Sequence, residues 1–248
     1  MNKKKSASKG VSIIISCFNE ENTIEECLQR LLATLPDAEI IVVHGGRDQT
    51  ATKARKISLD YPNIKVLKNY GDTGKGHAIK IGISIASNDV MAQMDADLQF
   101  MPEELPKLLE PIYQGEADIT FGARFMPESD VQHYKFSFFR VMGNKTVNSY
   151  FSMLTGLTFR DITTGHKAWT REAIEAIQFR DNRFVYEAEI AIKGSMKGFR
   201  FQMVPITYYN RLGGISGHGR GLQETFSIIL TGFKILFYGT LWKFRIIR

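Results

Sequence analysis

Two acidic residues follow an apolar run at a spacing that suits metal chemistry. Asp95 and Asp97 lie two positions apart, directly after Val90–Met94. Two carboxylates this close repel each other unless a positive group lies between or beside them. Mg²⁺ and Mn²⁺ take a few carboxylate or amide oxygens and share the oxygens of a bound phosphate compound. The segment 94–99 therefore indicates a metal-assisted reaction of a diphosphate, with an acidic loop that caps the helix expected after Pro102 as the alternative.

Other charged residues are candidates for phosphate or proton chemistry. Arg124 and Arg140 carry planar guanidinium groups that can bind phosphate through two hydrogen bonds, although an isolated arginine is usually a solvated surface charge. Asp161 is a candidate general base or a turn cap. Glu187 and Glu189 are similar candidates for a general base on a helix.

The segment Gly71–Gly76 has the composition of a phosphate-binding loop but not its spacing. A P-loop needs four residues between its glycines and a Ser or Thr after the lysine, whereas Lys75 is followed by glycine. The spacing therefore argues against an ATPase. The turn can still present N–H groups to an anion at a helix N-terminus, and a plain tight turn is the alternative.

These residues need a scaffold that brings them together. Between residues 11 and 121, short apolar runs alternate with helix-like segments. The expected strands are 11–16, 39–43, 64–67, 90–94 and 118–121, and the expected helices are one that opens with a capping box at 23–26, then 50–59, 76–86 and 102–114. This alternation predicts an α/β fold with a mostly parallel sheet and helices on both faces. The segments after the strands then converge at one edge, where ligands bind in such sheets.

The second half of the chain is less regular. Helices are expected at 135–154, 171–177, 186–197 and 222–244, and a strand is expected at 201–206. The last helix is long and apolar enough to consider as a membrane span, but Lys234 near its middle would cost about 2.5–3.5 kcal/mol at the centre of a bilayer. An amphipathic helix in the membrane interface is favoured, and packing on the domain core is the alternative.

Composition limits the domain organisation and the class of partner. The chain has 248 residues, 44% of them hydrophobic, and a net charge of +6. We expect a basic disordered tail at 1–10, one large domain at 11–215 and a C-terminal membrane-interface helical segment at 216–248. Cations in both terminal parts favour a membrane surface over nucleic acid. Cys17 and Cys27 form no metal motif or disulfide framework and no signal peptide is evident, so we expect a cytoplasmic protein, peripheral on the cytoplasmic face of the membrane.

Several ordered motifs together resemble one enzyme family. They are Ser12–Glu20, Val42–Val43 with a glycine-rich turn, Gly74–Gly76, Met94–Gln99, Gly122–Phe125, Asp161–Gly165 and Val204–Tyr208. Across residues 11–215 the chain is similar to the family 2 glycosyltransferases, which have the Rossmann-like GT-A fold, and within them to the dolichyl- or polyprenyl-phosphate mannosyl and glucosyl transferases. The resemblance implies transfer of a hexose, with inversion, from a nucleotide sugar to a polyprenyl (dolichyl) phosphate at the membrane surface, with Mg²⁺ or Mn²⁺ as cofactor.

The same resemblance implies how the donor is held. Asp97 and Gln99 would bind the metal ion, and Asp95 would lie near the ribose and diphosphate. Further contacts to the nucleotide sugar would come from the loops after the first strands and from a late loop, through Phe18, Glu20, Gly45, Lys75 and Arg211.

The resemblance also implies an acceptor site and a catalytic set. Arg124, Arg140 and Asn144 would bind the phosphate of the acceptor, and the catalytic residues would be the two aspartates of segment 94–99 together with Asp161. A phosphate oxygen is already ionised at neutral pH, so this acceptor requires no strong general base. A sugar hydroxyl would require one, and Asp161 or Glu189 would then be the first candidate.

One segment departs from the family pattern. The family usually shows two aspartates after the second strand, one of which contacts the nucleobase, whereas this chain has His44-Gly45-Gly46. The sequence thus leaves the nucleobase open, and Asp48 would substitute only if the loop moved. Two alternative functions remain: a glycosyltransferase that acts on a glycan hydroxyl for cell-surface polysaccharide, and a catalytically silent GT-A-like scaffold.

Overall fold

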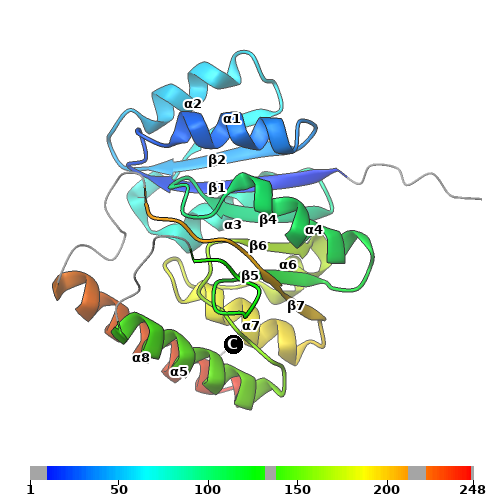
Figure 1. The fold of residues 1–248 in the computed structure, drawn as a ribbon, viewed down its shortest axis with the longest axis vertical. Coiled ribbons are helices and arrows are strands. Elements are labelled where there is room, and N and C mark those ends of the chain that lie inside the picture. The colour runs from blue at the N-terminus through cyan, green and yellow to red at the C-terminus, as the bar shows by residue number, and fades with distance from the viewer. Residues whose placement is uncertain (1–9, 132–137, 212–221, 247–248) are drawn as a thin grey trace, which may run out of the picture.

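A seven-stranded sheet forms the centre of the part of the chain that the computed structural model describes, which is residues 10–131, 138–211 and 222–246 (Figure 1). Its strands are β1 (Val11–Phe18), β2 (Glu39–Gly45), β3 (Ile64–Lys68), β4 (Val90–Asp95), β5 (Ile119–Ala123), β6 (Lys167–Thr170) and β7 (Phe201–Pro205). Their order across the sheet is β3-β2-β1-β4-β6-β5-β7. β6 runs antiparallel to β4 and β5, and the other neighbouring pairs are parallel.

The sequence predicts every described strand except β6. This strand has four residues, and its composition of Lys167, Ala168, Trp169 and Thr170 shows neither alternation nor an apolar run. It becomes a strand because it lies between β4 and β5, where both of its edges find backbone partners. The expected mostly parallel sheet is confirmed, with this one strand reversed.

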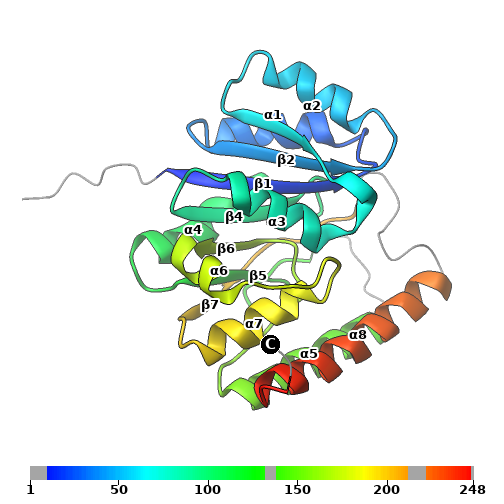
Figure 2. The same ribbon diagram turned by 180° about the vertical axis from the view of Figure 1, so that it is seen from behind.

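Helices cover both faces of the sheet, as expected (Figures 1 and 2). The helices are α1 (Ile24–Thr34), α2 (Thr50–Ser58), α3 (Lys75–Ile85), α4 (Leu105–Tyr113), α5 (Phe138–Thr155), α6 (Arg171–Ile177), α7 (Tyr186–Met196) and α8 (Leu222–Lys243), with short 3₁₀ turns η1 (Tyr70–Asp72) and η2 (Pro102–Glu104). Alternate residues of β1 enter opposite cores. Ile13 and Ile15 belong to the core that α1, α2 and α4 cover, and Ile14 belongs to the core that α3, α5, α6, α7 and α8 cover.

The expected capping box at the start of α1 is wrong. The Thr23 side chain accepts no hydrogen bond from the first turn of the helix. The backbone oxygen of Glu20 instead accepts from the N–H groups of Thr23 (3.1 Å) and Ile24 (3.0 Å). The hydroxyl of Thr23 donates to Glu20 as well, at 3.4 Å from its backbone oxygen and 3.3 Å from Oε2, so it faces away from the N–H groups of the first turn.

The C-terminal helix packs against the domain. α8 lies beside α5 and α7, and Ile235 and Trp242 are buried in this contact. The same helix exposes Phe233 and Phe237, which are 68% and 62% accessible. Among the described residues, no helix combines the length and the hydropathy that a membrane crossing requires. The expected tail at 1–10 and the boundary at 215 fall almost entirely outside the described residues and stay predictions.

Candidate active site

The carboxyl ends of the central strands line a cavity of about 710 Å³. Ser16 of β1 lies in register between Val43 of β2 and Asp95 of β4, so the loops after these strands begin at the same level. Phe18 and Gly45, at the ends of β1 and β2, and Asp95, at the end of β4, all line this cavity. The expected convergence of the strand ends at one edge is confirmed.

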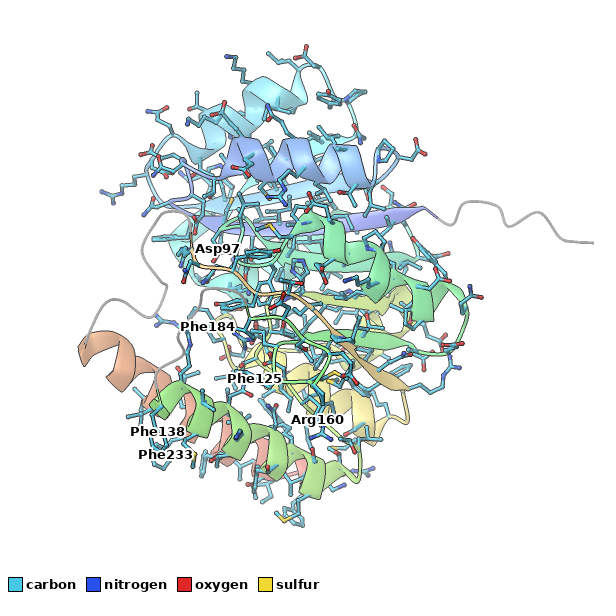
Figure 3. The ribbon with its side chains drawn as sticks, in the orientation of Figure 1. Asp97, Phe125, Phe138, Arg160, Phe184 and Phe233 are labelled. Atoms are coloured by element: carbon cyan, nitrogen blue, oxygen red, sulfur yellow. The ribbon has the colours of Figure 1, made fainter. Side chains whose placement is uncertain are left out.

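The cavity extends from the sheet edge to the helix pair α5–α8. The residues predicted for the site that line it are Phe18, Glu20, Gly45, Lys75, Asp95, Asp97, Gln99, Arg124, Arg140, Asn144 and Arg211. Figure 3 shows Phe184 and Phe125 between Asp97 and the helix pair, and both belong to the cavity wall. At the far end α8 contributes Phe233 and Ile235. One space therefore joins the end of the parallel strands to the apolar C-terminal helix.

Lys75 is paired with the first aspartate of segment 94–99. Its ammonium group lies 2.8 Å from Asp95 Oδ1 and 2.9 Å from Oδ2, and Ser16 Oγ donates to Oδ1 at 3.3 Å. Burial opposes the charge of Lys75, but the Asp95 carboxylate raises the pKa of Lys75 above its ordinary value. A fixed positive charge at this edge of the sheet suits a ligand phosphate.

The glycine turn before α3 is a packing turn. Gly74 has a φ of 120°, and a Cβ there would lie 2.5 Å from the backbone oxygen of Asn182. The N–H groups of Gly76 and His77 donate to the backbone oxygens of Arg183 and Asn182, both at 3.1 Å. These two amides are therefore occupied by the 181–183 loop and are not available to an anion.

The second aspartate lies beside an arginine from the late loop. Arg211 Nη2 forms an ion pair with Glu20 Oε1 and lies 3.5 Å from Asp97 Oδ2. Burial raises the pKa of Glu20 to about 7, although Arg211 acts in the other direction. Burial, followed by the charge of Asp95, raises the pKa of Asp97 to about 6. The predicted repulsion between close carboxylates is thus present and only partly balanced.

The donor set of Asp97 and Gln99 fits a hard divalent cation. The chain bends between them, because Leu98 has a φ of 56°, and Gln99 N donates to Asp97 Oδ1 at 3.1 Å. The amide nitrogen of Gln99 donates to the backbone oxygen of Tyr209 at 3.5 Å, so its amide oxygen is the atom suited to a cation. In the described ranges no group of three or more His, Cys, Asp or Glu side chains could hold a metal. These residues fit Mg²⁺ or Mn²⁺ that shares the phosphates of a ligand.

Arg124 is held in a fixed direction by Asp161. Arg124 Nε donates to Asp161 Oδ2 at 2.6 Å and Nη2 donates to Oδ1 at 2.9 Å. Burial acts to raise the pKa of Asp161, but Arg124 holds it below its ordinary value. Asp161 is fully buried and does not line the cavity, so its geometry is not that of a general base.

Asn144 belongs to the same buried group. Its amide nitrogen donates to Asp161 Oδ1 and to Thr163 Oγ1, both at 3.0 Å, and its amide oxygen accepts from Asn148. Asn144 thus reaches the cavity wall with its hydrogen bonds directed at the ion pair. Arg140, one turn earlier on α5, is half-buried and lines the cavity. Its predicted role at the acceptor phosphate stays a prediction.

Comparison with known proteins decides the family. The model of the family "glycosyl transferase family 2" matches residues 12–202. The chain belongs to this family. The members most like it include the polyprenol monophosphomannose synthase of Mycolicibacterium smegmatis, 30% identical over 82% of this chain and 79% of that protein. The dolichol-phosphate mannosyltransferase of Pyrococcus furiosus is 32% identical over 83% of this chain and 58% of its own length. The chain is therefore a hexosyltransferase of glycosyl transferase family 2.

Solved structures of glycosyltransferases share its GT-A fold. Mannosyl-3-phosphoglycerate synthase from Rubrobacter xylanophilus superimposes with a TM-score of 0.73 at 19% identity, over 96% of this chain and 76% of the other. Glucosyl-3-phosphoglycerate synthase from Mycobacterium tuberculosis, crystallised with Mn²⁺, UDP and glucosyl-3-phosphoglycerate, gives 0.69 at 17% identity, over 96% and 80%. At these identities the likeness shows the fold alone, and the expected fold class is confirmed.

The family's acidic pair after β2 is replaced here without a nearby substitute. His44 is buried, with 7% of its surface exposed. Asp48 accepts from Glu21 N at 2.9 Å, and its other carboxylate oxygen accepts from Thr50 N and Oγ1 at 3.1 and 2.6 Å. Asp48 is thus committed to the start of α2, and the loop does not bring it into the cavity lining.

Two acidic residues of α7 that look alike in sequence differ in the structure. Glu187 lines the cavity, whereas Glu189 accepts from the N–H groups of Arg180 and Asp181 and pairs with Lys193. Sequence reasoning also missed Lys167, a fully buried lysine of β6, whose pKa burial lowers to about 8. The sequence does not show which of Glu187 and Glu189 faces the cavity, because α7 is buried on several sides and both residues are buried.

Proposed function

We propose that this family 2 enzyme transfers a hexose from a nucleotide sugar to a polyprenyl phosphate at a membrane surface. The observation that carries the proposal is the continuous cavity that joins the ends of the parallel strands to α5 and α8. A water-soluble donor and a lipid acceptor need a site with a polar end and an apolar end, and this cavity has both. The similarity to a polyprenol monophosphomannose synthase and a dolichol-phosphate mannosyltransferase supports the same substrates.

The donor end would hold the nucleotide diphosphate. Asp97 and Gln99 would bind Mg²⁺ or Mn²⁺, which supplies positive charge for the diphosphate as it leaves. Lys75, held by Asp95, adds a second positive charge at this edge of the sheet. Phe18, which is 53% exposed, offers an aromatic surface to the nucleobase. Arg211 would exchange its contact with Asp97 for the diphosphate, since both partners line the same cavity.

The acceptor end would hold the lipid phosphate between two arginines. Arg124 has a direction set by Asp161, and Arg140 comes from α5 and lines the same cavity. An ionised phosphate oxygen then attacks the anomeric carbon from the face opposite the diphosphate, and the configuration inverts. The oxygen carries no proton at neutral pH, so the reaction needs no general base. This agrees with the buried, ion-paired geometry of Asp161.

The lipid chain of the acceptor would follow α5 and α8 into the bilayer. Exposed apolar residues gather on this helix pair, and Figure 3 shows Phe138 and Phe233 on its outer side. Phe138 is 72% and Phe233 is 68% exposed. Such a surface suits a membrane interface, with the protein peripheral on the cytoplasmic face. The lysines of α8 and the residues after it would meet lipid headgroups.

The test is a direct assay of transfer. Purified protein is incubated with Mn²⁺ or Mg²⁺, polyprenyl phosphate and, in turn, GDP-mannose, UDP-glucose and UDP-N-acetylglucosamine. We expect one donor to give a lipid-linked sugar that partitions into organic solvent, and we expect chelation of the metal or Asp97→Ala to abolish it. Asp89→Ala, at an exposed aspartate after α3, serves as the control. A product found only when a water-soluble glycan replaces polyprenyl phosphate would favour the polysaccharide alternative.

A further inference from the structure

Glu187 is a buried carboxylate of the cavity to which the proposed reaction assigns no role. It is 4% exposed and lines the cavity from the first turn of α7. Its Oε1 lies 3.6 Å from Lys75 Nζ and 3.7 Å from Lys167 Nζ. Both distances are longer than a hydrogen bond. Within the part of the chain that the structure describes, no group donates a hydrogen bond to this carboxylate.

A carboxylate that faces a cavity and accepts no hydrogen bond from the described protein groups can accept them from a ligand. Carboxylate oxygens only accept hydrogen bonds, and buried polar groups are nearly always satisfied. A ligand phosphate would be repelled, and a lipid chain has no donor to offer. A neutral hydroxyl group meets the requirement, and it forms a stronger hydrogen bond with a charged acceptor than with a neutral one.

The position of Glu187 in the cavity indicates which ligand hydroxyl groups can reach its carboxylate. Lys75 contacts both Glu187 and Asp95, so the carboxylate lies one ion pair away from the donor end of the cavity. Phe184, one turn earlier, lies between Asp97 and the helix pair α5–α8 (Figure 3). Glu187 lines the same cavity as Arg124 and Arg140, and it contacts Lys75 at the place proposed for the diphosphate. The carboxylate is therefore within the space that joins the diphosphate to the acceptor phosphate. In a transfer reaction this space is filled by the sugar.

We infer that Glu187 accepts a hydrogen bond from a hydroxyl group of the transferred hexose and thereby determines which nucleotide sugar the enzyme uses. The inference rests on the proposed function, since it assigns the sugar end of that same site. Lys75 and Lys167 hold the carboxylate in place through charge without using its lone pairs for hydrogen bonds. Glu189 is excluded from this role because its oxygens accept from backbone N–H groups outside the cavity.

The test compares donors that lack one hydroxyl at a time. Wild-type protein, Glu187→Gln and Glu187→Ala are assayed with the preferred nucleotide sugar and with its monodeoxy analogues. We expect wild-type protein to lose about 10- to 100-fold in kcat/KM on one analogue, which is the range for a lost hydrogen bond to a charged group. Glu187→Ala should lose a similar factor in kcat/KM on the normal donor. On the analogue that lacks the relevant hydroxyl, the kcat/KM of Glu187→Ala should equal that of the wild type.

Controls separate this role from a structural one. Glu189→Gln, a matched change two residues along α7, should lower activity by the same factor on every donor. The circular dichroism spectra of the Glu187 variants should match that of the wild type, which shows that they fold. Equal losses on all donors in Glu187→Ala, or a wild-type protein that treats all the deoxy donors alike, would overturn the inference and leave the proposed function intact. A wild-type protein that transfers no sugar would overturn both.

Discussion

Asp161 fixes the direction of the buried guanidinium group of Arg124. Arg124 is 8% exposed, and its Nε, Nη2 and backbone N–H all donate to Asp161. Burial disfavours the charge of Arg124, but Asp161 raises its pKa above the ordinary value. Asn144 and Thr163 complete the group. Asp161 is therefore a positioning residue in the proposed mechanism.

Replacement of Asp161 by asparagine tests this role. The variant leaves Arg124 as a buried charge without a counter-charge, which typically lowers the free energy of unfolding by about 3–5 kcal/mol. We also expect the KM for polyprenyl phosphate to rise while the KM for the donor stays the same. Urea unfolding and steady-state kinetics measure the two effects. Asp118→Asn is the matched control, at an exposed ion pair in which Arg200 Nη2 lies 2.6 Å from Asp118 Oδ1. It should lower the free energy of unfolding far less. Equal losses in the two variants would contradict the role.

A second prediction at this scale concerns acid stability. His166 is fully buried and stacks on Phe100 with ring centroids 4.9 Å apart. Burial lowers its pKa from 6.5 to about 4. Between these pH values the unfolded chain binds a proton that the folded chain does not, so stability falls as pH drops from 6.5 to 4. The loss from this group is on the order of 3 kcal/mol. The free energy of unfolding, measured with urea at each pH, should therefore change less steeply between pH 6.5 and 4 in His166→Gln than in the wild type. An unchanged slope would count against the prediction.

At the scale of elements, the sequence predicted the helices and strands that have a long apolar or periodic pattern. Long apolar or periodic segments such as β1 and α1 were predicted from sequence, because burial of one face determines the element. β6 was not, because four residues carry no period and only its neighbours β4 and β5 make it a strand. The capping box at Thr23 failed because the Thr23 hydroxyl donates to Glu20 and accepts nothing from the first turn of α1, a pairing that the sequence pattern does not contain.

The sequence of α8 suggested either a membrane-interface helix or a helix packed on the domain core, and the structure is compatible with both. One side packs on the domain through Ile235 and Trp242, and the other exposes Phe233 and Phe237, four residues apart on one face. Packing on the core and contact with a membrane are thus compatible, because they use different faces of one helix. The sequence pattern contained both sets of apolar residues but did not show which of them the domain would bury.

Membrane binding by this face is testable with charge substitutions. Phe233→Asp and Phe237→Asp should each weaken binding to anionic lipid vesicles by about tenfold or more, since burial of a phenylalanine side chain contributes about 1.5–3 kcal/mol. Co-sedimentation with vesicles measures this, and affinity for the nucleoside diphosphate should not change. Leu59→Asp, at a residue 84% exposed after α2, is the matched control. Equal binding by all three variants would exclude α8 as the membrane face.

At the scale of the whole molecule, the site is assembled from segments far apart in the chain. The sequence predicted which loops meet, because parallel strands place their carboxyl ends at one edge. It did not predict the pairings among side chains, such as Lys75 with Asp95 or Arg124 with Asp161, since these depend on distances across the sheet. Nor did it show that α8 lines the same cavity as β1. That continuity links the water-soluble donor to the lipid acceptor in one space.

The continuity of the cavity can be broken at one position without strain. Gly143 of α5 lines the cavity, its φ lies outside the left-handed region, and a Cβ built there meets nothing within 4 Å. Gly143→Phe should therefore fold, place an aromatic ring in the acceptor end, and raise the KM for polyprenyl phosphate at least about tenfold, a change of about 1.4 kcal/mol. Gly143→Ala, which adds a single carbon and favours the helix, should stay near wild-type activity. In both variants, calorimetric titration should give the wild-type affinity for the nucleoside diphosphate, because the donor end is unchanged. If Gly143→Phe used the lipid acceptor as well as Gly143→Ala does, the acceptor would have to reach the donor by a route other than this cavity.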